Sequence, residues 1–97
     1  MLIDSGSVEF EWDSGNQGKN AKHRVVDVEC EEPFFDRDKV VLKDPLHSGQ
    51  EERFILIGQT KKHRVLFIVF TRRKNKIRVI SARDLNRKER YLYEKGT

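Results

Sequence analysis

Three stretches of the sequence decide the fold: residues 53–58 (RFILIG), 64–71 (RVLFIVFT) and 76–82 (KIRVISA). Each is rich in β-branched and aromatic side chains, which pack well on a pleated sheet and favour strands. The segments that separate them, 59–63 and 72–75, are polar and have hairpin length, so the sequence predicts an antiparallel meander. The middle strand is apolar at every position from Val65 to Phe70, and we therefore expect both of its faces to be covered, by further layers of the fold or by a partner.

A strand and two short helices are expected ahead of this meander. Residues 8–12 (VEFEW) alternate apolar and polar side chains, which is the period of a half-buried strand. Residues 13–16 have turn composition, and a short polar helix is expected over about 16–23. Asp27 is a candidate N-cap for a second helix, which stays short because Pro33 cannot stand in a helix interior.

The remaining elements are a strand at 40–42, a loop at 43–50, and a final helix over about 84–94 that Ser81 or Asp84 can cap. The predicted order is therefore strand, two short helices, four strands and one helix. This is an α+β fold in which helices pack on an antiparallel sheet. The chain has 97 residues, 36% of them hydrophobic and 37% charged, which is enough for one globular domain over residues 1–97.

The sequence gives no sign of export or of membrane insertion. Residues 1–4 lack the basic segment and long apolar run of a signal peptide, and no stretch approaches the roughly 20 apolar residues of a membrane span. Cys30 is the single cysteine and cannot form an internal disulfide, which favours a reducing compartment. We therefore expect a cytoplasmic protein without membrane contact.

Charge is distributed unevenly along the chain. Residues 61–90 contain 12 of the 20 Lys and Arg residues and only two acids, so this segment carries +10, whereas the rest of the chain carries −6. A surface with concentrated positive charge attracts phosphodiester backbones. The alternative is a solvated, charge-rich surface without a ligand, which is the more common meaning of a charge run.

Several blocks of sequence recur in a fixed order. They are F-E-W-D at 10–13, K-N at 19–20, K-H-R-V at 22–25, E-E-R-F at 51–54, I-R-V-I-S-A-R at 77–83 and E-R-Y-L-Y-E at 89–94. In this order and spacing, over residues 8–94, the chain resembles the BrnT family of ribonuclease toxins. It departs from the family at Arg24, where the family prefers glycine, and at Pro33, which falls inside the family's second helix.

The resemblance implies a RelE-like microbial ribonuclease fold and the toxin role in a type II toxin–antitoxin system. It implies a metal-independent endoribonuclease that cleaves RNA, mRNA above all, and so inhibits translation. It also implies that a BrnA-type antitoxin neutralises the toxin in a hetero-oligomer. No cofactor is expected, and no metal site is predicted, since the sequence has no Cys/His cluster with ligand spacing.

Metal-independent cleavage of RNA needs a base, an acid and cations that stabilise the phosphorane. Arg78 and Arg83 are the first candidates, because guanidinium groups match phosphate oxygens and stay charged. Strict alternation places Arg78, Ile80 and Ala82 on one face of the strand, and Ile77, Val79 and Ser81 on the other. The alternative role for such an arginine is a salt bridge, with Glu51, Glu52 or Glu89 as partner.

The other catalytic candidates are Lys22 with His23, and Glu52 with Arg53. His23 suits proton transfer near neutral pH, although a lone histidine is more often a surface residue. Glu52 is a candidate base, or a residue that orients His23 or Arg78, and its alternative role is an ion pair at a strand edge. We expect His23, Arg78 and Arg83 on one concave, basic surface.

The candidate RNA-binding residues are Trp12, Arg72, Arg73, Lys76 and Arg90. Trp12 can stack on a base, although a single tryptophan in a strand more often belongs to the core. Two other functions stay open: a non-catalytic nucleic-acid-binding or adaptor module on the same fold, and a degenerate family member that retains only antitoxin binding.

Overall fold

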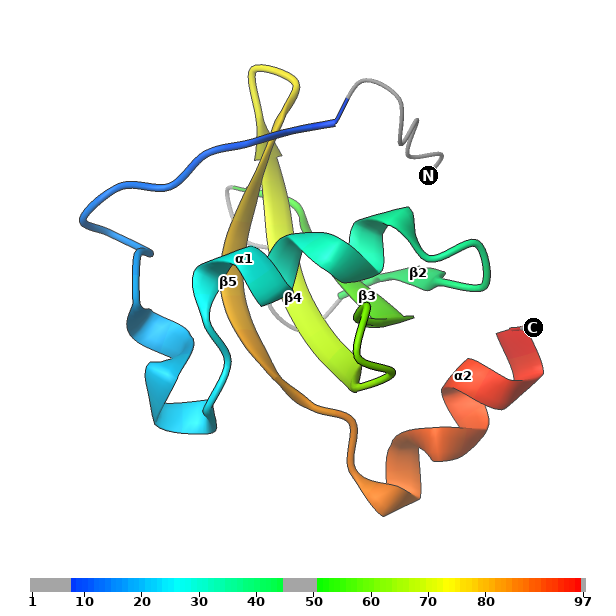
Figure 1. The fold of residues 1–97 in the computed structure, drawn as a ribbon. Helices are drawn as coiled ribbons and strands as arrows, with labels where there is room; N and C mark the ends of the chain where they lie inside the picture. Colours follow the sequence, from blue (N-terminus) through cyan, green and yellow to red (C-terminus); the bar gives the residue numbers. More distant parts are fainter. Residues whose placement is uncertain (1–7, 45–50, 97) are drawn as a thin grey trace.

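The computed structural model of the protein describes residues 8–44 and 51–96. With η denoting a 3-10 helix, its elements are β1 (Glu9–Phe10), η1 (Lys19–His23), α1 (Asp27–Glu31), η2 (Glu32–Phe35), β2 (Val40–Lys43), β3 (Arg53–Gln59), β4 (Val65–Arg73), β5 (Lys76–Asp84), η3 (Arg87–Glu89) and α2 (Arg90–Gly96) (Figure 1). The α+β class is confirmed. Most of the predicted loop at 43–50 falls outside the described residues.

The sheet has five strands in the order β1-β5-β4-β3-β2. Strands β2 to β5 form the predicted antiparallel meander. The expectation of a wholly antiparallel sheet is wrong at one edge, where β1 runs parallel to β5 and pairs Glu9 with Lys76 and Phe10 with Ile77. A hairpin forces its strands to be antiparallel, but β1 reaches β5 through a long connection that leaves its direction free.

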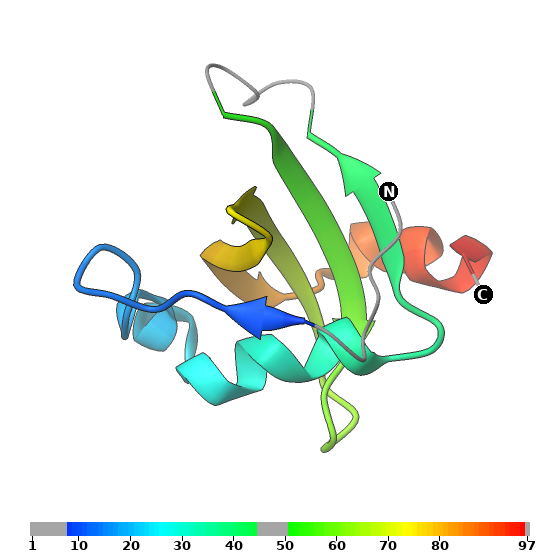
Figure 2. The same ribbon diagram turned by 90° about the horizontal axis from the view of Figure 1, so that it is seen from above.

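One face of the sheet, here called the core face, packs against the α1–η2 segment. Figure 2 shows this segment and α2 on opposite sides of the sheet. The core face presents Leu56, Ile68 and Phe70, all fully buried. The Phe34 ring of η2 meets that of Phe70 edge to face, with 5.1 Å between ring centroids. At Gly58 the backbones of β3 and η2 come so close that a Cβ atom would lie 2.8 Å from the carbonyl oxygen of a residue in η2.

The opposite face, here called the second face, carries Ile55, Phe67 and Val69. All three side chains are partly exposed, although β4 is apolar at each position. Helix α2 contacts β2 and β3, and the second-face side chains of β4 stay partly exposed, so within this chain the expected cover of β4 is only partial. A hydrophobic surface therefore stays open on the second face.

Both predicted helix caps need correction. Strand β5 continues through Asp84, so neither Ser81 nor Asp84 caps the final helix. Asn86 instead caps η3, the 3-10 turn that leads into α2, in a capping box with Glu89. Val26, and not Asp27, is the N-cap residue of α1. The Asp27 carboxylate instead accepts a hydrogen bond from the backbone N–H of Gly18, the residue before η1. The predicted short helix around Pro33 is confirmed, because α1 passes into 3-10 geometry there.

Two left-handed backbone positions shape the connections. Lys74 and Asn75, with φ of 50° and 69°, make the two-residue β4–β5 turn, so both strands are longer than predicted. Arg24 ends η1 with φ 60°, a left-handed conformation that favours glycine, so a non-glycine residue stands here in strained backbone. None of the described helices is long and apolar enough to cross a membrane.

Candidate functional site

A β-bulge interrupts the pairing of β4 with β5. Val69 lies opposite Ser81 and Phe70 lies opposite Val79, so Ile80 is an extra residue on β5. An extra residue shifts the alternation of side chains by one position. On one side of the bulge, side chains of β5 therefore point to the opposite face from the one that strict alternation predicts.

The bulge brings Arg78 and Arg83 to the same face of the sheet. Strict alternation grouped Arg78 with Ala82, and this grouping is wrong, because Ala82 is fully buried in the core cluster. Arg78 lies opposite Thr71 and Arg83 opposite Phe67, and these two partners are four residues apart on β4. Side chains separated by four residues in a strand point the same way, so both arginines lie on the second face.

A hollow of about 390 Å³ lies on the second face. Its lining comprises the apolar side chains of Ile55, Phe67, Val69 and Ile80 with the polar residues Asp44, Arg53 and Ser81. Arg53 also lies opposite Thr71, so Arg53 and Arg78 flank the same β4 residue. The second face thus combines an apolar concave floor with three arginines from two strands.

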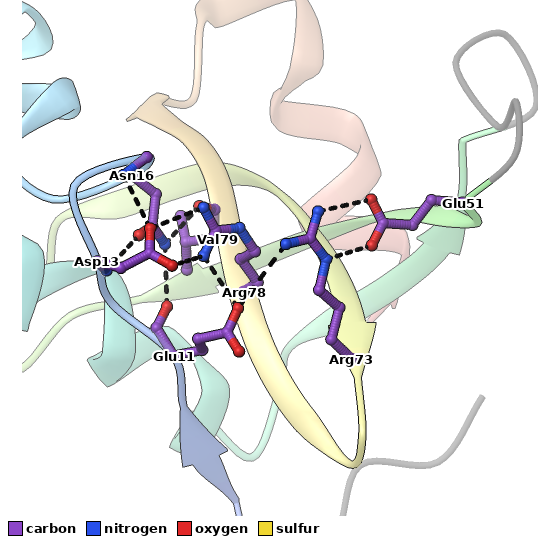
Figure 3. Close-up of polar contacts among 8 residues, drawn as sticks. Glu11, Asp13, Asn16, Glu51, Arg73, Arg78 and Val79 are labelled. Atoms are coloured by element: carbon purple, nitrogen blue, oxygen red, sulfur yellow. Dashed lines mark hydrogen bonds and ion pairs between the residues drawn. The ribbon is translucent and has the colours of Figure 1, made fainter.

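Arg78 is held by acidic residues from the N-terminal segment (Figure 3). Its two terminal nitrogens donate to both carboxylate oxygens of Asp13 at 2.9 Å, and one of them also donates to Glu11 at 2.9 Å. Its side chain is only 12% exposed. The hydrogen bond from Arg78 lowers the pKa of Asp13, so both groups stay charged. The network continues through Arg73, whose guanidinium lies 3.9 Å from Glu11 and binds Glu51.

Arg83 has a different environment at the other end of β5. Its guanidinium donates two parallel bonds of 2.8 Å to the carboxylate of Glu89. It also lies over the Phe67 ring, 4.2 Å from the centroid, which is a cation–π contact. The hydrogen bond from Arg83 lowers the pKa of Glu89. Of the three expected salt-bridge acids, Glu89 therefore pairs with Arg83, whereas Arg78 pairs with Glu11 and Asp13.

Lys22 and His23 lie at the end of η1, and both are exposed. Arg64 donates to the carbonyl oxygen of His23 at 3.1 Å and also forms an ion pair with Asp84. His23 therefore lies near the end of β5 that carries Arg83, away from the Asp13 end that holds Arg78.

The structure separates Glu52 from Arg53. The Glu52 carboxylate lies 2.6 Å from the ammonium group of Lys43, in an exposed ion pair. It lines a hollow with Phe54, a core-cluster residue, and with Arg72. Glu52 and Arg72 therefore lie toward the core face, whereas Arg53 lines the hollow on the second face.

The other candidate RNA-binding residues are dispersed. Trp12 packs against the core cluster and its indole N–H donates to Glu31 at 2.7 Å, which matches its alternative role as a core residue. Lys76 is exposed at the start of β5. Arg90 lines a cleft between α2 and the β3–β4 turn, together with His63.

Sequence reasoning missed the residues that hold the site together. Glu11 and Asp13 belong to the F-E-W-D block, but no spacing rule links them to Arg78, 65 and more residues away. Asp44, nearly buried beside the hollow, carried no sequence signal either. Within residues 8–44 and 51–96, no three His, Cys, Asp or Glu side chains gather closely enough to hold a metal ion.

Residues 12–89 match a family model described as ribonuclease toxin, BrnT, of type II toxin–antitoxin system. The chain belongs to the BrnT family. The match spans most of the chain and includes η1, the whole meander and the Arg78–Arg83 segment. A search of curated proteins gave no match.

Membership of the BrnT family confirms the resemblance found in the sequence. A ribonuclease toxin of a type II system acts on RNA and has an antitoxin protein as its partner. Arg78 and Arg83 and the acids paired with them are therefore considered below as parts of an RNA site.

Proposed function

We propose that the protein is a metal-independent endoribonuclease toxin that binds RNA on the second face of its sheet. Its substrate is mRNA, and a BrnA-type antitoxin neutralises it. Arg53, Arg78 and Arg83 bind phosphates, and the apolar hollow between them receives a base or a ribose. The protein acts in the cytoplasm.

The observation that carries this proposal is the bulge at Ile80, because it aims Arg78 and Arg83 at one face. Bulges beside active sites often re-aim a side chain in this way. Their β4 partners are four residues apart, which is roughly 13 Å along a strand, so we assign the two arginines to separate phosphates of one RNA strand. Arg53 lines the hollow between them.

The proposed reaction is an attack of the ribose 2′-hydroxyl on the adjacent phosphorus, in line with the leaving 5′-oxygen. It forms a 2′,3′-cyclic phosphate and a free 5′-hydroxyl. Arg83 stabilises the charge that builds on the phosphorane, because its guanidinium lies above Phe67 at the edge of the hollow. His23, exposed near the same end of β5, is the candidate for proton transfer, with Lys22 beside it.

A catalytic role for Glu52 has less support than one for Arg83 or His23. Its ion pair with Lys43 and its place toward the core face favour its alternative role as a strand-edge residue. Glu52→Gln should therefore leave cleavage within a few-fold of the wild-type rate.

One observation favours the second function, an RNA-binding module without catalysis. Arg78 and Arg83 already bind carboxylates in the free protein, so RNA must share or displace Asp13 and Glu89. A module that binds RNA without cleaving it needs no arginine free to stabilise a phosphorane, so these ion pairs are compatible with that function.

The test is cleavage of a labelled single-stranded RNA by purified protein in EDTA. Arg83→Gln should lower kcat/KM by about 100-fold or more, the usual effect of removing a group that stabilises transition-state charge. Arg78→Gln should weaken RNA binding and reduce the slope of log K against log salt by about 0.7, the value for one phosphate on a single strand.

The matched control is Arg37→Gln, because Arg37 is exposed in the turn after η2 and is not part of the lining of the hollow. It should cleave RNA like the wild type. Binding without cleavage by the wild type would support the RNA-binding module instead. If Arg78→Gln and Arg83→Gln changed binding and cleavage no more than Arg37→Gln does, the proposed site would be contradicted.

A further inference from the structure

A groove of about 440 Å³ lies between the α1–η2 segment and the β3–β4 turn. Two of its lining side chains are large, apolar and exposed: Val28 is 61% exposed and Phe35 is 50% exposed. Val26, just before α1, is 56% exposed. Apolar side chains that gather around a groove commonly mark a protein interaction surface.

The same groove is acidic. Its lining includes Glu31, Glu32 and Asp36, and the basic residue among its lining is Lys61. The carboxylates accept hydrogen bonds from neutral donors: Glu31 from the Trp12 indole at 2.7 Å, Glu32 from the Lys61 backbone N–H at 3.0 Å, and Asp36 from the Tyr93 hydroxyl at 2.7 Å. Neutral donors satisfy the oxygens but leave the negative charges in place.

The Asp36 carboxylate is ionised at neutral pH. Burial by itself raises its pKa, but hydrogen bonds from Tyr93 and from two backbone N–H groups outweigh the burial, and the pKa is lowered. The groove therefore presents apolar side chains within a negatively charged rim.

We infer that this groove, termed the acidic groove, is the docking site for the antitoxin, which inserts apolar side chains flanked by Lys or Arg. The inference deepens the proposed function, because it takes the antitoxin as the partner that family membership implies. RNA is excluded as the occupant, since its phosphates are repelled by the rim. A second copy in a two-fold dimer is excluded too, because symmetry would place each acidic rim against itself.

This assignment separates the two surfaces of the toxin. The antitoxin binds the α1–η2 side, and RNA binds the second face on the other side of the sheet (Figure 2). Substitutions in the acidic groove should then affect antitoxin binding and leave RNA cleavage unchanged.

The experiment measures binding of a purified BrnA-type antitoxin to this chain, by calorimetry. Val28→Glu replaces an exposed apolar side chain by an acid and should weaken binding by about 30-fold or more, as expected for a central interface residue. Tyr91→Glu is the matched control, since Tyr91 is 58% exposed on α2. It should change the affinity by less than about 3-fold.

Glu32→Gln is a second variant that keeps a hydrogen-bond acceptor for the Lys61 N–H and removes one charge. It should reduce the dependence of the affinity on salt. Wild-type affinity for Val28→Glu together with an unchanged salt dependence for Glu32→Gln would overturn the inference. The inference would also be overturned if Phe67→Glu abolished antitoxin binding while Val28→Glu retained it, because the antitoxin would then bind the second face.

Val28→Glu should cleave RNA at the wild-type rate, and this readout separates the two proposals. An inactive wild type that still binds antitoxin through the groove refutes the ribonuclease proposal alone. If the wild type cleaves RNA and substitutions in the acidic groove leave the affinity for the antitoxin unchanged, the docking inference alone is refuted.

Discussion

Asn20→Ala tests how the N-terminal segment is attached to the sheet. The Asn20 side chain is 2% exposed. Its Oδ1 accepts the backbone N–H of Ala82 at 2.9 Å, and its Nδ2 donates to the Cys30 sulfur at 3.7 Å. Because η1 flanks β5 at this point, Asn20 supplies the acceptor that a neighbouring strand would otherwise provide.

The magnitude follows from these contacts. Alanine leaves the buried N–H of Ala82 without its acceptor, which costs about 1–3 kcal/mol. The space left by the amide adds about 1 kcal/mol, since a well-packed interior relaxes only partly. We therefore expect Asn20→Ala to lower the free energy of unfolding by about 2–4 kcal/mol. For a domain of this size, that corresponds to a fall in Tm of at least about 8 °C.

Urea denaturation and thermal melting both measure this loss. Lys19→Ala is the control, because Lys19 is exposed on the same 3-10 helix and should change the free energy by less than about 0.5 kcal/mol. A loss below about 0.5 kcal/mol for Asn20→Ala would refute the reasoning, because the Ala82 N–H would then have another acceptor.

Three further predictions concern single residues. Arg83 lowers the pKa of Glu89 from its ordinary 4.5, so the stabilising contribution of Glu89 is present above pH 4.5 and is lost as the pH falls through the lower pKa of the folded state. Glu89→Gln should therefore flatten the dependence of Tm on pH below pH 4.5, and an unchanged dependence would contradict this. Arg24→Gly should raise the free energy of unfolding by up to about 1 kcal/mol in urea, since it relieves a left-handed backbone, and a loss would mean that the arginine side chain stabilises the fold. Burial raises the pKa of the Cys30 thiol to about 12, so it should react with a thiol reagent only after unfolding, and rapid labelling of the native protein would refute its burial.

The sequence was sufficient for the features that depend on local patterns. Strands β3 to β5 follow from runs of β-branched and aromatic residues separated by short polar turns. The short, irregular helix at Pro33 follows from the covalent geometry of proline. Family membership followed from ordered blocks of sequence, which do not require knowledge of any contact.

The sequence was not sufficient for features that depend on the relation between strands. The bulge at Ile80 has no local signature, because Ile80 is an ordinary strand former and becomes an extra residue only through the register of β5 against β4. The parallel direction of β1 and the pairing of Arg78 with Glu11 and Asp13 are likewise set by a contact across the edge of the sheet.

The sequence alone therefore determined the α+β class, the central meander, the BrnT family and the candidate arginines Arg78 and Arg83. Tertiary structure alone decided how these two arginines come to share a face, through the bulge at Ile80, and which carboxylates hold them. The physical reason is that strand periodicity is a property of the local backbone, whereas register, bulges and ion pairs arise only when distant segments pack together.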